Sequence, residues 1–127
     1  MTSNSPRNVS VRDLLQYKFP LTALVSIGHR ISGVLVFLSL PGLLWFLCAS
    51  ARDPDGFMAV KRCLATFSGG LMAFVFLAAF FYHAIFGIKH LLMDCGFFEE
   101  KKSGFWASLV CLIIFGFALI GLGVYVW

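Results

Sequence analysis

Three long apolar stretches constrain what this chain can fold into more strongly than any other feature. They run over about residues 21–49, 64–92 and 105–127. A helix needs about 20 predominantly apolar residues to cross the hydrocarbon core of a bilayer, and each stretch exceeds that length. With 60% hydrophobic and only 13% charged residues, the chain has no polar remainder large enough for a soluble catalytic domain. The sequence therefore predicts an all-α membrane protein with three transmembrane helices.

The domain organisation follows from the same pattern. Residues 1–20 are polar and are expected to form an N-terminal head, while residues 21–127 form the three-helix transmembrane anchor. Residues 1–20 also lack the apolar core and the cleavage site of a signal peptide, which favours a protein of the bacterial inner membrane. Three helices alone make a small bundle, so we expect the anchor to belong to a larger bundle built from several subunits and surrounded by membrane lipid.

The distribution of basic residues predicts the orientation. Six basic residues lie before the first span or around the connection between the second and third spans, whereas three lie between the first and second spans. The first group is Arg7, Arg12, Lys18, Lys89, Lys101 and Lys102, and the second is Arg52, Lys61 and Arg62. The positive-inside rule then places the N-terminus in the cytoplasm and the C-terminus outside. A net charge of +4 is too small to suggest a nucleic-acid partner.

Ionisable side chains inside the first two spans are the candidate functional residues, because such groups are costly in hydrocarbon and normally face protein or a cavity. Counting 1.5 Å per helical residue, His29 lies about 13 Å past Pro20, and His83 lies about 15 Å before Met93. Since the first two spans run antiparallel, the two histidines are predicted to lie at a similar depth on the cytoplasmic side.

Helical spacing adds neighbours to these histidines. One face of the second span is predicted to carry Met72, Phe76, Ala79, His83, Gly87 and His90. Ala79 and Gly87 would leave room on either side of His83 for a flat macrocycle. On the first span, Ser26 and Arg30 are one turn apart, with His29 beside them. An arginine within a span demands an anion or strong acceptors, which a haem propionate or a quinone carbonyl would provide.

The residues alone leave alternatives open. His83 would be satisfied by a hydrogen bond to a neighbouring helix, and Arg30 by extending its side chain to the membrane surface. His90 is interpreted as an interfacial residue. The chain has three histidines, so it supports at most one bis-histidine haem, whose second ligand would be His29 or a histidine of another chain.

Two segments resemble known motifs. Residues 26–33, SIGHRISG, resemble the S-x-x-H-R-x-[ST]-G motif of the cytochrome b556 membrane-anchor family of succinate dehydrogenase (respiratory complex II). Residues 83–90, with Asp94 and Gly96, resemble the second motif of that family, H-x-x-x-G-[IL]-[RK]-H…D-x-G. The resemblance covers about residues 15–100, and Lys89 stands where arginine is commoner.

The resemblance implies a function in electron transport and the tricarboxylic acid cycle. Electrons from succinate would pass through a flavoprotein subunit and an iron–sulfur subunit to ubiquinone at the anchor. By motif position, Ser26 and Arg30 would contact the quinone, and His29 and Arg30 the haem propionates. His83 would be an axial ligand of haem b, shared with a second membrane-anchor subunit. A fumarate-reductase-type anchor using menaquinone and a non-redox multi-pass subunit remain as alternatives.

Overall fold

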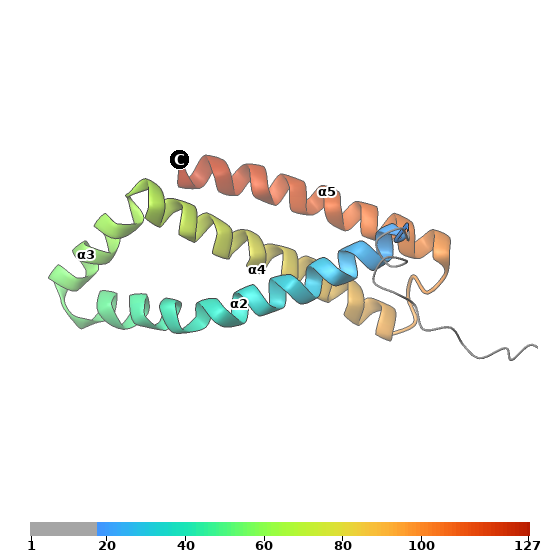
Figure 1. Ribbon diagram of the computed structural model, residues 1–127, viewed down its shortest axis with the longest axis horizontal. Helices are drawn as coiled ribbons and strands as arrows, with labels where there is room; N and C mark the ends of the chain where they lie inside the picture. The colour runs from blue at the N-terminus through green and yellow to red at the C-terminus, as the bar shows by residue number, and fades with distance from the viewer. Residues whose placement is uncertain (1–17) are drawn as a thin grey trace, which may run out of the picture.

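The computed structural model describes residues 18–127, so most of the predicted head lies outside the described residues. Within this range the chain forms four helices, α2 (Leu21–Arg52), α3 (Pro54–Leu64), α4 (Phe67–Asp94) and α5 (Lys101–Val126) (Figure 1). Helices α2, α4 and α5 are long and apolar enough to cross a membrane. The predicted all-α class with three candidate membrane spans is therefore confirmed, with span limits within four residues of those expected from the sequence.

Short polar motifs set the limits of the helices. The carboxylate of Asp53 accepts a hydrogen bond from the backbone N–H of Gly56 at 2.6 Å, and Pro54 occupies the first position of α3. The hydrogen bond satisfies a backbone N–H group that has no partner within the helix. Proline is tolerated at the first position because the N–H group that it lacks would not be hydrogen-bonded within the helix. Helix α3 thereby connects the C-terminal end of α2 to the N-terminal end of α4. It lies on the side of the molecule opposite to the N-terminus of α2 (Figure 1).

Helix α4 ends in a Schellman motif. Gly96 has a φ of 87°, a conformation that costs glycine little because it has no Cβ atom. The backbone N–H of Gly96 donates to the carbonyl of Met93 at 2.9 Å, and that of Phe97 donates to the carbonyl of Leu92 at 3.0 Å. These two bonds satisfy carbonyl groups that the helix leaves free at its end, so the chain turns directly towards α5.

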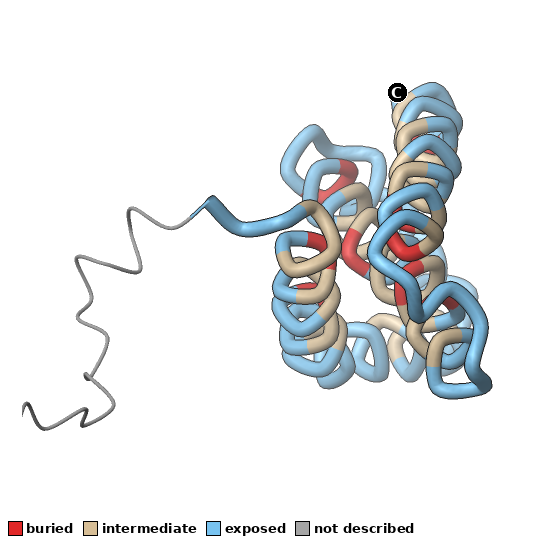
Figure 2. Tube along the Cα trace, turned by 90° about the vertical axis from the view of Figure 1, so that its right-hand side faces the viewer, coloured by how far each residue is buried: buried red, intermediate tan, exposed pale blue. Residues whose placement is uncertain are grey.

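Helix α4 lies between α2 and α5 and packs against both (Figure 1). The buried residues gather where the helices face one another (Figure 2). Phe86 of α4 is completely buried, and Val25 of α2 and Leu122 of α5 are buried on the helices beside it. The hydroxyl of Tyr82 donates to the carbonyl of Val25 at 3.2 Å, and its ring meets Phe115 edge-on with centroids 5.0 Å apart. Tyr82 therefore contacts both neighbouring helices at the level of the buried core.

Most large apolar side chains point outwards. Phe37 of α2 and both Phe117 and Val124 of α5 are each about 70–80% exposed. Contiguous apolar surface of this extent is unfavourable in water, whereas it is the normal exterior of a membrane protein. The exterior therefore agrees with a chain surrounded by lipid and by other membrane subunits.

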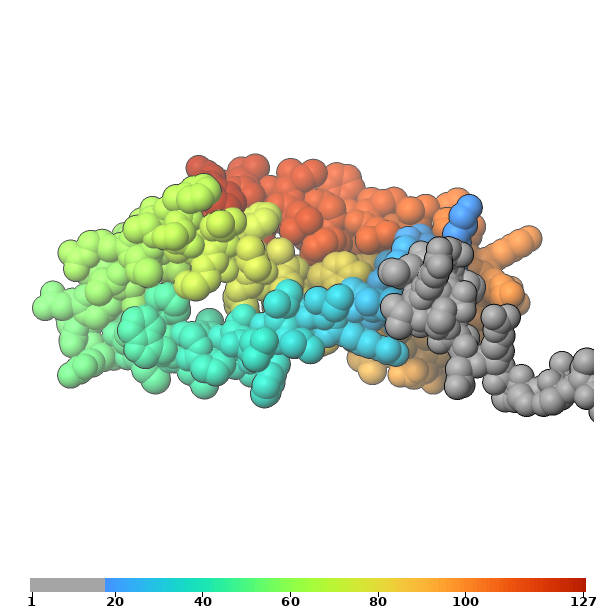
Figure 3. All heavy atoms as spheres, viewed as in Figure 1, coloured from blue at the N-terminus to red at the C-terminus, as the bar shows by residue number. Residues whose placement is uncertain are grey.

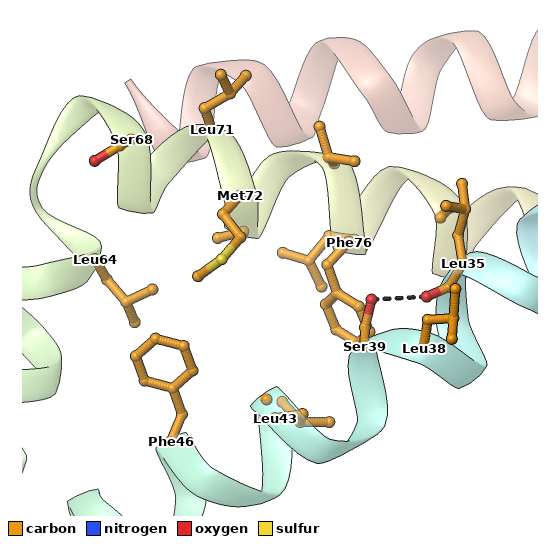
Figure 4. A pocket seen from close by; sticks show the side chains of 15 residues that line it. Leu35, Leu38, Ser39, Leu43, Phe46, Leu64, Ser68, Leu71, Met72 and Phe76 are labelled. Carbon is orange, nitrogen blue, oxygen red and sulfur yellow. Dashed lines mark hydrogen bonds between the residues drawn. The ribbon is translucent and has the colours of Figure 1, made fainter.

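An apolar cavity of about 780 Å³ separates the second half of α2 from the first half of α4 (Figures 3 and 4). Pro41 lies inside α2 at this level, and its missing N–H favours a bend there. The hydroxyl of Ser39 is already bonded to the carbonyl of Leu35 at 2.7 Å. Leucine, phenylalanine and methionine side chains make up most of the lining (Figure 4). The lining contains the hydroxyls of Ser39 and Ser68 and no ionisable side chain, so the ionisable candidate residues lie elsewhere.

Candidate functional site: a histidine cluster between α2 and α4

The three histidines of the chain lie together. The rings of His29 in α2 and His83 in α4 are stacked, with centroids 4.2 Å apart and 4° between their planes. His90 follows His83 by seven residues in α4, about two helical turns, and its ring centroid lies 5.1 Å from that of His29 with a tilt of 47°. The prediction that His29 and His83 share one depth is therefore confirmed.

Glycines make this approach of the two helices feasible. A Cβ atom on Gly33 would lie 2.9 Å from Cε1 of His83, and one on Gly87 would lie 3.3 Å from Nε2 of His29. Each stacked histidine thus rests on a glycine of the opposite helix, as expected where small residues allow close packing in membranes. The spacing of Gly87 from His83 suggested space there for a macrocycle. The structure shows no such space, because the ring of His29 lies against Gly87.

His83 is oriented by α2. Its Nδ1 lies 3.1 Å from the backbone carbonyl of His29 and 3.4 Å from the hydroxyl of Ser32, which itself donates to the same carbonyl at 2.8 Å. Because a carbonyl only accepts hydrogen bonds, Nδ1 carries the proton and Nε2 presents its lone pair. Nε2 of His83 has no hydrogen-bond partner within the described range and is not enclosed. Histidines that bind metals are commonly held in this way.

His29 and His90 each bury a nitrogen without a partner. Nε2 of both rings is inaccessible to solvent and makes no hydrogen bond to any residue between 18 and 127. A buried polar atom that stays unpaired loses its interactions with water without replacement. Within residues 18–127 these two nitrogens are therefore buried without a compensating hydrogen bond.

Ser26 and Arg30 lie outside the cluster. Ser26 is half-buried and Arg30 is exposed, and in the described part of the chain the single ion pair joins Arg52 and Asp53 at 3.9 Å. The guanidinium of Arg30 nevertheless lies close enough to His90 for their charges to interact. The structure thus brings His29 and His83 together and places Ser26 and Arg30 on the adjoining surface of α2, available to a ligand or another subunit.

Sequence reasoning missed two members of the site. Ser32 is 5% exposed and contacts His83. In the sequence, the feature that could have indicated it is a hydroxyl side chain three residues after His29 within an apolar span. His90, interpreted from the sequence as interfacial, also contacts the ring of His29 and so belongs to the cluster. Its signal was the seven-residue spacing from His83, which places both on one face of a helix.

The cluster does not form a complete metal site by itself. Among residues 18–127, no group of three or more histidine, cysteine, aspartate or glutamate side chains is arranged to hold a metal ion. The stacked rings of His29 and His83 are in van der Waals contact, so no macrocycle fits between them. In this arrangement the two side chains cannot lie on opposite sides of one metal ion.

Comparison with known proteins decides the family. Residues 2–123 match the family described as succinate dehydrogenase/fumarate reductase transmembrane subunit. The chain belongs to this family. It is similar to the succinate dehydrogenase cytochrome b556 subunit of Coxiella burnetii, with 32% identity over 126 residues, covering 98% of this chain and 99% of the relative.

Other members of the family support the assignment over most of the chain. The cytochrome b556 subunit of Rickettsia felis is 33% identical over 101 residues, covering 77% of this chain and 78% of the relative. That of Paracoccus denitrificans is 28% identical over 92 residues, covering 72% and 71%. The motif resemblance is therefore confirmed, and the chain belongs to a family of multi-pass transmembrane subunits of succinate dehydrogenase and fumarate reductase.

Proposed function

We propose that this succinate dehydrogenase subunit binds haem b through His83 and forms part of the site where ubiquinone is reduced. The observation that carries the proposal is the orientation of His83. Its Nδ1 is held by the carbonyl of His29 at 3.1 Å, which leaves Nε2 as a free ligand atom. An orienting hydrogen bond of this kind selects the tautomer and makes the ligand more basic.

The residues around His83 fit a haem. The name cytochrome b556 of the relatives agrees with this ligand type, and a bound haem would supply one-electron transfer. Nε2 of His83 would hold the iron, while His29 and Arg30 would meet the propionates. His29 contributes a buried, unpartnered Nε2, and Arg30 contributes a positive charge that no carboxylate within residues 18–127 neutralises.

A second ligand to the haem iron would come from a second membrane-anchor subunit. The stacking of His29 on His83 removes His29 as the opposite ligand, and His90 lies beside His29 rather than across from His83. The haem would therefore lie at the boundary between this chain and its partner, so both subunits are needed to hold it.

Ser26 and Arg30 would act on the quinone. Reduction places negative charge on a quinone carbonyl oxygen, and a hydroxyl donor together with a cation stabilises that charge. Two protons must also reach the oxygens, which favours a position near the membrane surface. Both residues lie in the first three turns of α2, the end that the basic residues assign to the cytoplasm. There the iron–sulfur subunit would deliver electrons received from the flavoprotein subunit.

Spectroscopy of the purified complex tests the proposal. We expect a b-type band in the reduced-minus-oxidised spectrum, reduction of that haem by succinate, and turnover with ubiquinone. The bacterial inner membrane is the proposed location, with the N-terminus in the cytoplasm. A complete complex without a haem band would contradict the proposal, and a strong preference for menaquinone would favour the fumarate-reductase-type alternative.

A further inference from the structure

We propose that the apolar cavity between α2 and α4 binds an acyl chain of a phospholipid whose anionic headgroup lies against Lys61 of α3. The cavity is separate from the histidine cluster, and none of the side chains proposed to contact haem or quinone lines it. The lipid would be a structural one, bound at the end of the bundle opposite to the N-terminus of α2.

The cavity follows from the way in which α2, α3 and α4 are joined. Helices α2 and α4 approach closely where Gly33 and Gly87 meet the histidine rings, and they separate towards α3 (Figure 1). With 11 residues, α3 is about 16 Å long, whereas helices in direct contact lie about 8–10 Å apart. The halves of α2 and α4 next to α3 therefore do not close on each other. Since well-packed proteins contain few voids larger than a water molecule, this space calls for an occupant.

The dimensions and the lining of the cavity fit an acyl chain. Its volume of about 780 Å³ lies in the range typical of ligand pockets. On α2 the lining runs from Leu35 to Phe46, which is about 16 Å of helix and close to half of a hydrocarbon core of about 30 Å. Leu64 and Met72 point into the space (Figure 4), and Figure 3 shows the surface hollowed between the two helices. A chain of one lipid leaflet thus has the required depth and a lateral entrance.

The charge at the α3 end favours an anionic headgroup. Lys61 and Arg62 are exposed and have no carboxylate partner within residues 18–127, where the single ion pair joins other side chains. Lys61 precedes Leu64 by three residues, so the two lie on one side of α3, and Leu64 lines the cavity. Basic residues at a membrane surface attract anionic lipids. Lys61 is therefore placed beside the end of the cavity, where the phosphate of a bound lipid would lie.

Helix α3 has the pattern of a helix that lies at a membrane surface. Phe57, Val60 and Leu64 recur at the spacing of one helical face, and basic amphipathic helices of this kind lie at the interface with their apolar face towards the acyl chains. Arg62 lies about 160° from Leu64 around the helix axis. It carries the same charge as Lys61 on the other side of α3 and so provides a matched control.

The test uses the intact complex in a non-ionic detergent and a phosphatidylglycerol with a photoactivatable diazirine near the end of one acyl chain. After illumination, mass spectrometry locates the labelled residues, and unlabelled phosphatidylglycerol or phosphatidylcholine competes for the site. We expect labelling to concentrate on the cavity-lining segments of α2 and α4. Phosphatidylglycerol should compete about fivefold better than phosphatidylcholine, as expected for one cation that acts on an anionic lipid.

Two pairs of variants separate the acyl chain from the headgroup. Gly42 lines the cavity, and a Cβ added there meets nothing within 4 Å, so Gly42→Leu fills the space and should reduce labelling by about tenfold. Gly116 of α5 is equally open but lies outside the lining, so Gly116→Leu should label like the wild type. Lys61→Gln should weaken competition by phosphatidylglycerol about fivefold, whereas Arg62→Gln should leave it unchanged.

Several results would overturn the proposal. Labelling spread evenly over the exposed faces of the three spans, and unchanged in Gly42→Leu, would show bulk lipid only. Absence of label from the cavity segments of the assembled complex would show that another subunit covers them, and competition by a long-tailed ubiquinone alone would assign the cavity to an isoprenoid tail. Equal competition by the two phospholipids, unchanged in Lys61→Gln, would remove the headgroup site. Because Lys61 is exposed, its variant decides the question even if Gly42→Leu fails to assemble.

Discussion

The imidazole rings of His29 and His83 lie parallel at 4.2 Å, while the backbone carbonyl of His29 accepts the hydrogen bond from Nδ1 of His83 at 3.1 Å. One residue of α2 thus covers a face of the His83 ring and also orients it. The same contact between α2 and α4 therefore packs the two helices together and orients the proposed iron ligand. Changes that separate these helices should disturb haem binding even when His83 itself is unchanged.

Replacing the proposed ligand should abolish haem binding. In His83→Leu the side-chain volume is largely kept but the ligand atom is lost, and the stacked geometry prevents His29 from taking its place. We expect the purified complex to contain less than about a tenth of the wild-type haem, since an axial ligand contributes several kcal/mol to metal binding. The measurement is the haem-to-flavin ratio. The exposed Phe81, two residues earlier in α4, provides the control Phe81→Leu, and full haem content in His83→Leu would refute the assignment.

The glycine under His83 should be sensitive to a single methyl group. In Gly33→Ala the added Cβ would lie 2.9 Å from Cε1 of His83, so the ring or the helix must move, at a cost of about 1–3 kcal/mol. Gly42 lies in the same helix with nothing within 4 Å of an added Cβ, so Gly42→Ala should be neutral or slightly stabilising. Thermal unfolding followed by haem absorbance would separate the two variants, and identical behaviour would argue against the contact.

The guanidinium of Arg30 should matter for quinone reduction and little for earlier electron transfer. Arg30→Gln removes a charge opposite the developing oxyanion, so we expect kcat/KM for ubiquinone to fall by about 100-fold. Arg30→Lys should retain part of the activity because the charge remains. Succinate-dependent reduction of a soluble dye should be unchanged. Arg52→Gln, at the other end of α2 beside Asp53, is the matched control and should keep wild-type turnover.

The orientation can be tested with the native cysteines. Cys63 in α3 and Cys95 after α4 are both exposed, and they lie at opposite ends of α4. With the other cysteines replaced by serine, we expect a membrane-impermeant maleimide to label Cys63 in intact spheroplasts. Cys95 should react only after lysis. The reverse pattern would show that the basic residues do not orient this chain as the positive-inside rule predicts.

The sequence by itself determined the features that depend on local chemistry. The three spans follow from the length of the apolar stretches, the start of α3 from Asp53 and Pro54, and the end of α4 from Gly96. The common depth of His29 and His83 also followed, because the rise per residue of a helix is constant. None of these features requires knowledge of how one helix is rotated against another.

The tertiary structure decided which side chains touch. The stacking of His29 on His83, the resting of each ring on a glycine of the opposite helix, and the inclusion of His90 and Ser32 all depend on the rotation of α2 and α4 about their axes. That rotation is set by packing along the whole interface, including the contact of Tyr82 with α2 and α5. Spacing along a helix places residues on a common face, but only the packed interface selects which residue of the neighbouring helix occupies the space beside them.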